Sequence, residues 1–196
     1  MERHELEELH YITAIANVPS ILARGILSHR LAAEIQHESV AMVEIQERRA
    51  KVVVPGGRRL HEYANLYVCA RNPMLFTRST HHLDLCVLRV DPGILDLPGV
   101  VITDANASSD YVRFASSPAG LAIIDRERTF AEYWTDPDPF EYYRKKSAKC
   151  AEVLVPDRVP SNFVTGAYVS CGEAGARFAA QGIELPTEID QYLFFR

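Results

Sequence analysis

The stretch SAKCAEVLV, residues 147–155, places a carboxylate at the entrance of a short apolar strand. The alternation of a strand puts Glu152 on one face with Leu154, and puts Val153 and Val155 on the other. A glutamate in this position is either a residue at the rim of a sheet or a carboxylate held for catalysis. Burial would raise its pKa, and a nearby cation would lower it. The stretch therefore predicts a strand of the core and makes Glu152 the first candidate for chemistry.

Composition and length are those of an ordinary globular protein. The chain has 196 residues, 47% of them hydrophobic and 24% charged, which predicts one domain over residues 1–196. The net charge of −5 argues against a broad basic face for duplex nucleic acid, although it is compatible with a local basic groove. No apolar run has the length of a membrane span, and the acidic, polar N-terminus is not typical of a signal peptide.

The four cysteines lie far apart, and no Cys/His spacing typical of a zinc site occurs. We therefore expect reduced thiols, no bound metal and a cytoplasmic location.

Short strand patterns crowd the second half of the chain without regular helical crossovers, which favours an α+β fold. We expect the strands 83–91 and 99–104 to be neighbours, since only a turn with Pro and Gly parts them. No G-x-G-x-x-G motif and no P-loop occurs, so a nucleotide would not be held by a Rossmann fingerprint. The other expected strands are 8–13, 64–70, 152–155, 163–170 and 191–196. The expected helices are 18–24, 40–50, 73–78, 129–134, 140–149 and 173–182, and Ser39 is the expected N-cap of the second.

The stretch 46–59 concentrates positive charge at the end of a predicted helix. Arg48 and Arg49 are neighbours there, and neighbours on a helix point about 100° apart. One of the two can therefore turn inward to a phosphate while the other meets solvent or nucleic acid. Arginine suits a phosphate because its planar fork binds two oxygens. The alternative is a solvated helix end whose cations are favoured by the helix dipole.

A second candidate region is the strand and helix start over residues 9–22. His10, Tyr11 and Thr13 lie on the predicted strand, and Asn17 lies at the start of the helix, where we expect it to be the N-cap. Polar groups that lead into a helix N-terminus can form a corner that holds a nucleotide. A third region, around Tyr67, is either an aromatic stripe of the core or part of the same site.

Taken in chain order, these stretches resemble one family, the DarT toxins, which are DNA ADP-ribosyltransferases of bacterial toxin–antitoxin pairs. The resemblance runs from about residue 9 to residue 155, and it is specific because several motifs occur together and in order. The motifs are HYITAIANVPSILARGILS, IQERRAKV, GGRRLHEYANLYVCARNPML, ITDANAS followed by VRF, and KKSAKCAEVLV.

The resemblance implies an ADP-ribosyltransferase fold, with a central split antiparallel or mixed sheet, flanking helices and an NAD cleft. It implies that Glu152 is the catalytic glutamate and Arg49 the active-site arginine. The NAD⁺ co-substrate is then expected against His10, Tyr11, Thr13, Asn17, Tyr67 and Met74. The acceptor is expected to be a base of single-stranded DNA, because such a base is accessible without having to leave a duplex. The residues expected to contact this DNA are Arg48, Lys51, Asn106 and Arg113. A macrodomain antitoxin is the expected protein partner.

Two departures from the family pattern concern recognition. Many relatives have Tyr-His before Ile-Thr on the first strand, whereas this chain has His10-Tyr11, which leaves open which of the two faces NAD⁺. Asn106 stands where some relatives that modify thymidine have a histidine. An asparagine presents both a donor and an acceptor, and this favours guanine slightly over thymine as the modified base.

Two other functions remain compatible with the sequence. One is an enzyme of the same fold that acts on RNA, similar to the RNA 2′-phosphotransferases, which would need further basic residues around a bound phosphate. The other is a nucleotide-binding module without turnover, against which the presence of both Arg49 and Glu152 argues.

Overall fold

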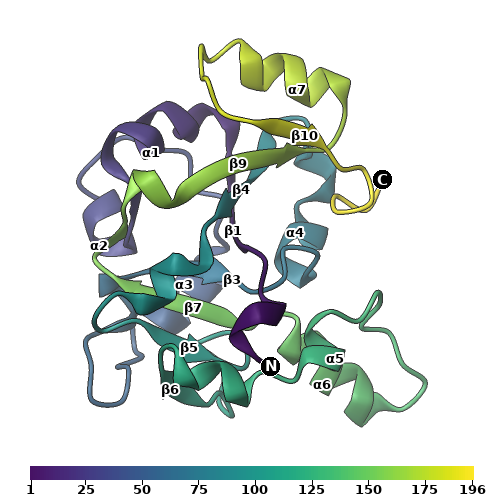
Figure 1. The fold of residues 1–196 in the computed structure, drawn as a ribbon. Coiled ribbons are helices and arrows are strands. Elements are labelled where there is room, and N and C mark those ends of the chain that lie inside the picture. The colour runs from purple at the N-terminus through teal and green to yellow at the C-terminus, as the bar shows by residue number, and fades with distance from the viewer.

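The computed structural model describes residues 1–196 and is built around an eight-stranded sheet with the order β10-β9-β4-β1-β3-β7-β5-β6 (Figure 1). Every neighbouring pair is antiparallel except β10 and β9, which run parallel. The strands of this sheet are β1 (Leu9–Ala14), β3 (Tyr63–Tyr67), β4 (Leu85–Val90), β5 (Val101–Thr103), β6 (Phe114–Ser116), β7 (Glu152–Pro156), β9 (Val164–Val169) and β10 (Thr187–Ile189). A separate pair consists of β2 (Ile26–Leu27) and β8 (Arg158–Val159).

Seven α-helices flank the sheet, and most are short. They are α1 (Val18–Arg24), α2 (His29–Ala32), α3 (Val43–Arg49), α4 (Pro73–Thr77), α5 (Arg126–Thr129), α6 (Pro139–Ala148) and α7 (Gly172–Ala179). In Figure 1, α5 and α6 form an arm at one end of the molecule, and α7 lies across the opposite end. None of the helices has the length and apolar character that crossing a membrane requires. The mixture of one large sheet with short flanking helices is the predicted α+β class.

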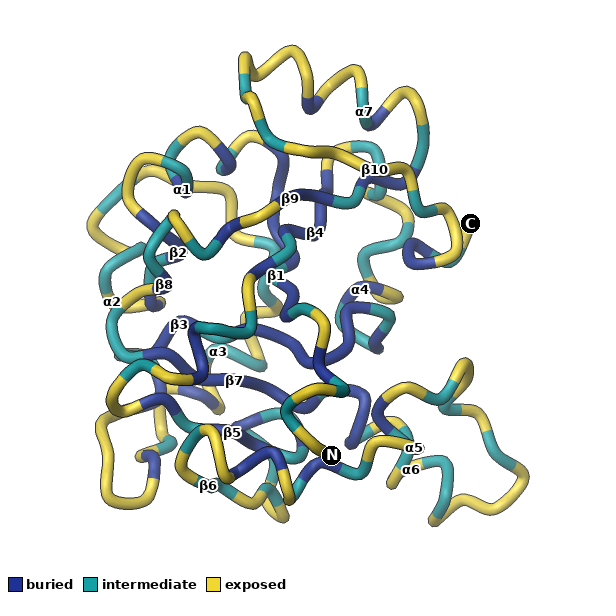
Figure 2. Tube along the Cα trace, viewed as in Figure 1, coloured by how far each residue is buried: buried dark blue, intermediate teal, exposed yellow.

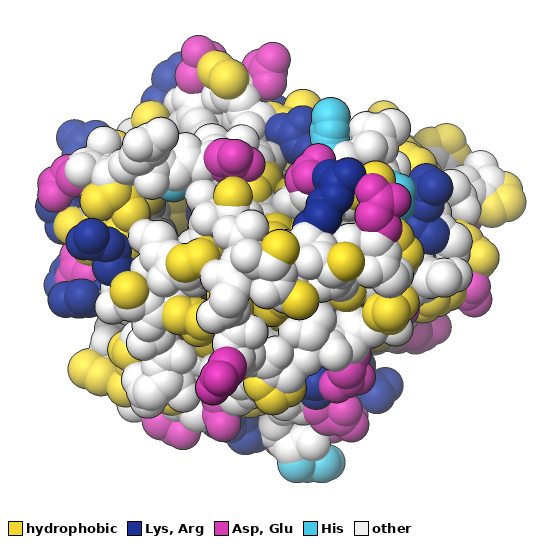
Figure 3. Space-filling model, turned by 90° about the horizontal axis from the view of Figure 1, so that it is seen from above, with side chains coloured by type: hydrophobic (Ala, Val, Ile, Leu, Met, Phe, Trp, Pro, Cys, Tyr) yellow, Lys and Arg dark blue, Asp and Glu magenta, His cyan; other side chains and the backbone are white.

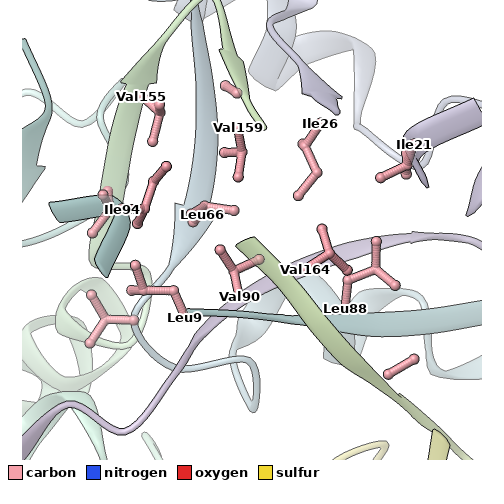
Figure 4. Close-up of a cluster of buried hydrophobic side chains, with 14 of the residues drawn as sticks. Leu9, Ile21, Ile26, Leu66, Leu88, Val90, Ile94, Val155, Val159 and Val164 are labelled. Carbon is pink, nitrogen blue, oxygen red and sulfur yellow. The ribbon is translucent and has the colours of Figure 1, made fainter. Parts of the chain in front are cut away.

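The central strands are buried on both faces, as the dark blue trace of β1, β3, β4 and β7 in Figure 2 shows. One face carries a cluster of 27 buried residues, in which Leu9, Leu66 and Val155 meet side chains from the β2–β8 pair (Figure 4). A smaller cluster of 8 buried residues includes Ile12 and Tyr67. A third cluster of 5 buried residues contains Leu154 with Leu60 and Tyr63. Since apolar burial is the main driving force of folding, the strand that carries Glu152 is fixed by Val153 and Val155 in the first cluster and by Leu154 in the third.

Several local predictions are wrong, and each has a physical reason. The strands β4 and β5 are not neighbours, because β1, β3 and β7 lie between them. Residues 191–196 do not form a strand, because the chain turns there to bury Leu193 and Phe194 in the smaller cluster. Residues 130–134 are not helical, because Lys149 reaches into this segment and takes backbone carbonyls as acceptors.

Two predicted helix caps also fail. The helix expected over 40–50 begins only at Val43, so Ser39 does not cap it. Asn17 has helical backbone angles, and its side chain does not cap α1. Its amide instead donates to Thr13 Oγ1 at 3.2 Å and to the Glu38 carbonyl at 2.8 Å. Asn17 therefore fastens the segment before α3 to the end of β1.

Candidate active site

A cleft of about 650 Å³ opens over the middle of the sheet. Side chains from α3 and α6 line it, as do residues of β1, β3, α4 and the loop 106–109. The segment 37–42 closes part of the rim, where Asn17 holds it through the backbone of Glu38. The cleft therefore gathers four of the stretches that the sequence marked as separate candidates.

Glu152 lies under the floor of this cleft and is 0% exposed. It is the first residue of β7, opposite Tyr67 on one neighbouring strand and Thr103 on the other. Its backbone N–H donates to Thr103 Oγ1 at 3.2 Å. A strand that is paired on both sides is rigid, so the carboxylate is held in one place, as a catalytic group requires.

Arg49 covers the carboxylate. Its Nη1 atom donates to both oxygens of Glu152, at 3.0 Å each, and the residue is only 5% exposed. Arg49 lines the cleft whereas Glu152 does not, so the guanidinium separates the carboxylate from the open space. The two residues are 103 positions apart in the chain, and the sheet and the end of α3 bring them together.

The environment has opposing effects on the acidity of Glu152. Burial raises the pKa of Glu152, while the charge and hydrogen bonds of Arg49 and the backbone amide of Ala107 lower it, and the raising effect is larger. Burial also raises the pKa of Tyr67, and the neighbouring Glu152 charge adds to this effect. Tyr67 is therefore a neutral phenol beside the carboxylate.

The two arginines of α3 point in different directions, as the helix geometry predicts. Arg49 turns inward to Glu152, whereas Arg48 is exposed and lines the mouth of the cleft. Burial of Arg49 costs hydration, and the ion pair offsets this cost only because both oxygens of the carboxylate are bonded. Arg48 keeps its guanidinium free for a ligand in the cleft.

Most of the residues predicted to contact NAD⁺ line the cleft, but one of them does not. Tyr11, Thr13 and Asn17 line the cleft, and so do Tyr67 and Met74 from β3 and α4. His10 does not line it: its Nε2 atom lies 3.1 Å from Glu8 Oε1, and its Nδ1 atom is buried without a partner. The structure thus brings Tyr11 to the cleft, whereas His10, which pairs with Tyr67 across β1 and β3, is turned to Glu8.

Of the four residues expected to contact DNA, two line the cleft and two do not. Arg48 and Asn106 line the cleft. Lys51 is exposed beyond the end of α3 and does not line the cleft. Arg113 is bound elsewhere: its side chain donates to Asp104 at 2.6 Å and to the Ile123 carbonyl at 3.0 Å. The structure therefore does not bring Lys51 and Arg113 into the cleft.

Asn106 is held within its own loop. Its Oδ1 atom accepts hydrogen bonds from the Ser108 N–H at 2.9 Å and from the Ser108 hydroxyl at 2.7 Å. This arrangement is the side-chain turn that asparagine often makes. The acceptor of the amide is thus occupied, and the Nδ2 donor is the part of the side chain left for a ligand.

Sequence reasoning missed several residues that line the cleft, among them His29 and Gln46. The ring of His29 stacks on His61 with centroids 4.1 Å apart, and burial lowers the pKa of both imidazoles. A lone histidine in a sequence gives no sign of such a pair, because the two lie 32 positions apart and meet only through α2 and the turn before β3. Tyr143 and Lys146 belong to a helix that the sequence did predict, but its orientation toward the cleft depends on tertiary packing.

No cluster of three or more His, Cys, Asp or Glu side chains could hold a metal ion.

Comparison with known proteins gives one consistent family. A family model described as "ssDNA thymidine ADP-ribosyltransferase, DarT" matches residues 10–195. The chain is 34% identical over 200 residues to a DNA ADP-ribosyl transferase–DNA ADP-ribosyl glycohydrolase fusion protein of Thermosipho africanus, and the match covers 96% of this chain and 49% of that protein. The chain thus spans about half the length of that relative.

Two solved structures of Thermus sp. 2.9 DarT are also similar. The one in complex with ADP-ribosylated ssDNA has a TM-score of 0.80 and 27% identity, and the match covers 97% of both chains. The one in complex with NAD⁺ has a TM-score of 0.76 and 26% identity, and the match covers 97% of this chain and 98% of that one. The predicted ADP-ribosyltransferase fold is confirmed by these likenesses, and the predicted enzyme class by the family match. The chain belongs to the DarT family of DNA ADP-ribosyltransferases.

Proposed function

We propose that this protein transfers ADP-ribose from NAD⁺ to a base of single-stranded DNA and releases nicotinamide. The observation that carries the proposal is the buried pair of Glu152 and Arg49 under a cleft of about 650 Å³ in a chain of the DarT family. The similar Thermus sp. 2.9 structures contain NAD⁺ and ADP-ribosylated ssDNA, which are the co-substrate and the product of this reaction.

Glu152 has two tasks in the proposed reaction. When the bond between nicotinamide and ribose breaks, its electrons leave with nicotinamide, and positive charge develops on the ribose. A fixed carboxylate beneath the sugar stabilises that charge. A nitrogen of the base then bonds to the ribose carbon, and Glu152 accepts the proton that this nitrogen loses. The raised pKa of Glu152 makes it a better base for this step.

Arg49 has to yield part of its contact before Glu152 can act. Both carboxylate oxygens accept hydrogen bonds from Arg49, and Glu152 has no exposed surface of its own. Binding of the ribose over the floor of the cleft would exchange one of these bonds for a bond from a ribose hydroxyl. Arg49 then remains close enough to hold a phosphate or to neutralise charge on the attacking base.

The co-substrate would lie along the wall made by β1, β3 and α4. Tyr11, Thr13 and Asn17 form one end of this wall, and Tyr67 and Met74 form the other. His10 has no part in this arrangement, because it lies outside the cleft. The segment 37–42 would close over the bound nucleotide, since it already forms part of the rim.

Single-stranded DNA suits the charge of this protein. On the face shown in Figure 3, acidic and basic side chains are interspersed, and no basic patch dominates. The net charge is −5, so binding has to depend on a few local cations such as Arg48. A base in a duplex would also have to leave its stack, at a cost of a few kcal/mol, roughly.

Guanine is the base we propose as acceptor, with thymine as the alternative that the family description names. Two groups that are free at the substrate side of the cleft are donors, namely the guanidinium of Arg48 and the Nδ2 group of Asn106. Guanine offers two adjacent acceptors, O6 and N7, and a bidentate arginine is their commonest partner. The acceptor of Asn106 is occupied by Ser108, so this proposal rests on donors alone.

The family match supports a proposal for the cellular role. We propose that the protein is the toxin of a toxin–antitoxin pair in the cytoplasm, where its four unpaired cysteines stay reduced. Its partner would be an antitoxin of the macrodomain class that removes the modification. The Thermosipho relative supports this role, because it joins a DNA ADP-ribosyl transferase to a DNA ADP-ribosyl glycohydrolase in one chain.

Mass spectrometry of oligonucleotides after incubation with NAD⁺ tests the proposal. Single-stranded DNA, its duplex and RNA of the same sequence are compared, and labelled strands are digested to nucleosides to identify the base. We expect an ADP-ribosyl adduct on the single DNA strand. An adduct only on RNA would favour the RNA-directed enzyme, and NAD⁺ binding without nicotinamide release would favour the module without turnover.

A further inference from the structure

The rim segment 37–42 is a thin wall between two hollows. Glu38, Ser39 and Val40 line the cleft over the sheet, and the same residues line a second cavity of about 700 Å³. Residues 37–41 take part in no backbone–backbone hydrogen bond. A segment with so few contacts opens at a low cost in free energy. Its position over the cleft therefore depends on the side chains that hold it.

Two side chains from outside the segment bind its backbone. Asn17 binds Glu38 twice, since it accepts from the Glu38 N–H at 2.9 Å and donates to the Glu38 carbonyl at 2.8 Å. Arg78 binds Val40, since its Nε atom donates to the Val40 carbonyl at 2.9 Å. The Val40 side chain also packs against the cluster of 8 buried residues. The segment is thus fastened at one point by Asn17 and at a second point by Arg78.

Arg78 is a firm point of attachment because it directly follows α4. The buried Asn72 caps this helix, and its Oδ1 atom accepts hydrogen bonds from the N–H groups of Met74 and Leu75 at 3.0 and 3.1 Å. The Arg78 N–H donates to the Leu75 carbonyl at 3.1 Å and so closes the last turn. Helix α4 also brings Met74 to the cleft wall. Arg78 therefore ties the rim to a helix that itself forms part of the cleft.

We propose that Arg78 is a positioning residue for NAD⁺, which holds segment 37–42 over the cleft through the Val40 carbonyl. The proposal rests on the function proposed above. Arg78 does not line the cleft, so it acts through the segment and not by contact with the co-substrate. The apparent affinity of a ligand falls with the fraction of protein in the competent conformation. Loss of the Arg78 hydrogen bond should therefore weaken NAD⁺ binding and leave the chemical step at Glu152 unchanged.

The chain allows variants that separate the hydrogen bond from the charge. Glutamine carries an amide nitrogen at the same place along its side chain as the Nε atom of arginine, whereas methionine carries a methyl carbon there. Arg78→Gln and Arg78→Met both remove the charge, and Arg78 has no carboxylate partner that would be left alone. The control is Arg177→Met, because Arg177 also lines the second cavity but binds Asp84 and Glu173 instead of the segment.

Three measurements are made on each variant. Hydrogen exchange of residues 37–42 without any ligand reports how often the segment opens. Calorimetry gives the Kd for carba-NAD⁺, in which a carbon replaces the ring oxygen of the nicotinamide ribose, so that no oxocarbenium ion can form. The labelling assay with single-stranded DNA gives the KM for NAD⁺ and kcat.

Arg78→Met should raise the Kd for carba-NAD⁺ and the KM for NAD⁺ about fivefold, the size expected for one hydrogen bond. Exchange in residues 37–42 should become faster, and kcat should not change. Arg78→Gln should behave like the parent because it keeps the donor, and so should Arg177→Met.

Unchanged exchange, Kd and KM in Arg78→Met would overturn the proposal. An equal loss in Arg78→Gln would also overturn it, since the charge and not the hydrogen bond would then matter, as would an equal loss in Arg177→Met. A parent that neither binds carba-NAD⁺ nor labels DNA would refute the proposed function, and the exchange rates would still decide whether Arg78 holds the segment.

Discussion

Replacing Arg49 with methionine should destabilise the fold in a way that depends on pH. Methionine keeps an unbranched stem over the floor of the cleft but removes the donor to both oxygens of Glu152. The carboxylate is then buried without a partner, and breaking a buried pair in this way typically costs about 3–5 kcal/mol. Arg49→Ala should cost less, because the shorter side chain admits water from the cleft to the carboxylate.

The pH dependence follows from the sign of the pKa shift. Burial raises the pKa of Glu152 above the ordinary value of 4.5, and loss of Arg49 raises it further. Stability from a carboxyl with a raised pKa is fully present below the unfolded value and is lost as the pH rises toward the folded value. The deficit of Arg49→Met relative to the parent should therefore be small below the folded-state pKa of Glu152 in the parent, and above that pKa it should grow by about 1.4 kcal/mol per pH unit. The growth stops where the pH passes the still higher folded-state pKa of Glu152 in the variant.

Urea unfolding followed by the fluorescence of Trp134, the single tryptophan of the chain, measures this deficit at about pH 5 and about pH 7. Arg48→Met is the matched control, since Arg48 is exposed, and it should change stability little at either pH. The double variant Arg49→Met/Glu152→Gln should lose the pH dependence. A deficit in Arg49→Met that is the same at both pH values would show that Glu152 is not the partner that matters.

Three further outcomes are expected. Arg49→Ala should reduce NAD⁺-dependent transfer far more than Arg48→Ala, because Arg49 contacts Glu152; a larger loss of kcat in Arg48→Ala would mean that the roles are reversed. Asn106→Asp should keep the loop, since aspartate retains the acceptor for Ser108, but should reduce labelling of the base because the Nδ2 donor is lost; full activity would show that Asn106 only shapes the loop. With about two to four phosphates contacted, the affinity for single-stranded DNA should fall with salt at a log–log slope of about −1.4 to −3, and a slope near zero would exclude the local cationic groove.

The elements that the sequence predicted well are those with a strong local signal. Strands β1, β7 and β9 and helices α1, α4 and α6 lie where the periodic patterns and the prolines placed them. The failures depend on tertiary contacts that no local pattern contains. Residues 191–196 contain a short apolar and aromatic run typical of a strand, yet Leu193 and Phe194 are buried in a turn.

In the candidate site too, features set by local geometry could be predicted from the sequence, and features set by tertiary contacts could not. Helix geometry alone predicts that Arg48 and Arg49 point in different directions, whereas the choice of Arg49 as the inward one came from the family resemblance. The alternation of β1 likewise separates His10 from Tyr11. Alternation cannot say which of these two faces the cleft, because both faces of the sheet are buried. Lys51 and Arg113 carry the positive charge that DNA binding requires. The ion pair of Arg113 with Asp104, however, forms only in the folded loop and could not be read from the sequence. The stacked pair of His29 and His61 depends on the packing of α2.

The most direct test of the central claim is the single-turnover rate of ADP-ribose transfer to a single-stranded DNA oligonucleotide, measured for the parent and for Glu152→Gln. Glutamine keeps the size of the buried side chain but cannot carry the charge that stabilises the ribose or accept the proton of the base. The transfer rate should fall by at least about 10²-fold, while NAD⁺ binding and the urea midpoint at acidic pH stay close to those of the parent. A folded Glu152→Gln protein that labels DNA at nearly the parental rate would contradict the assignment of Glu152 as the catalytic carboxylate.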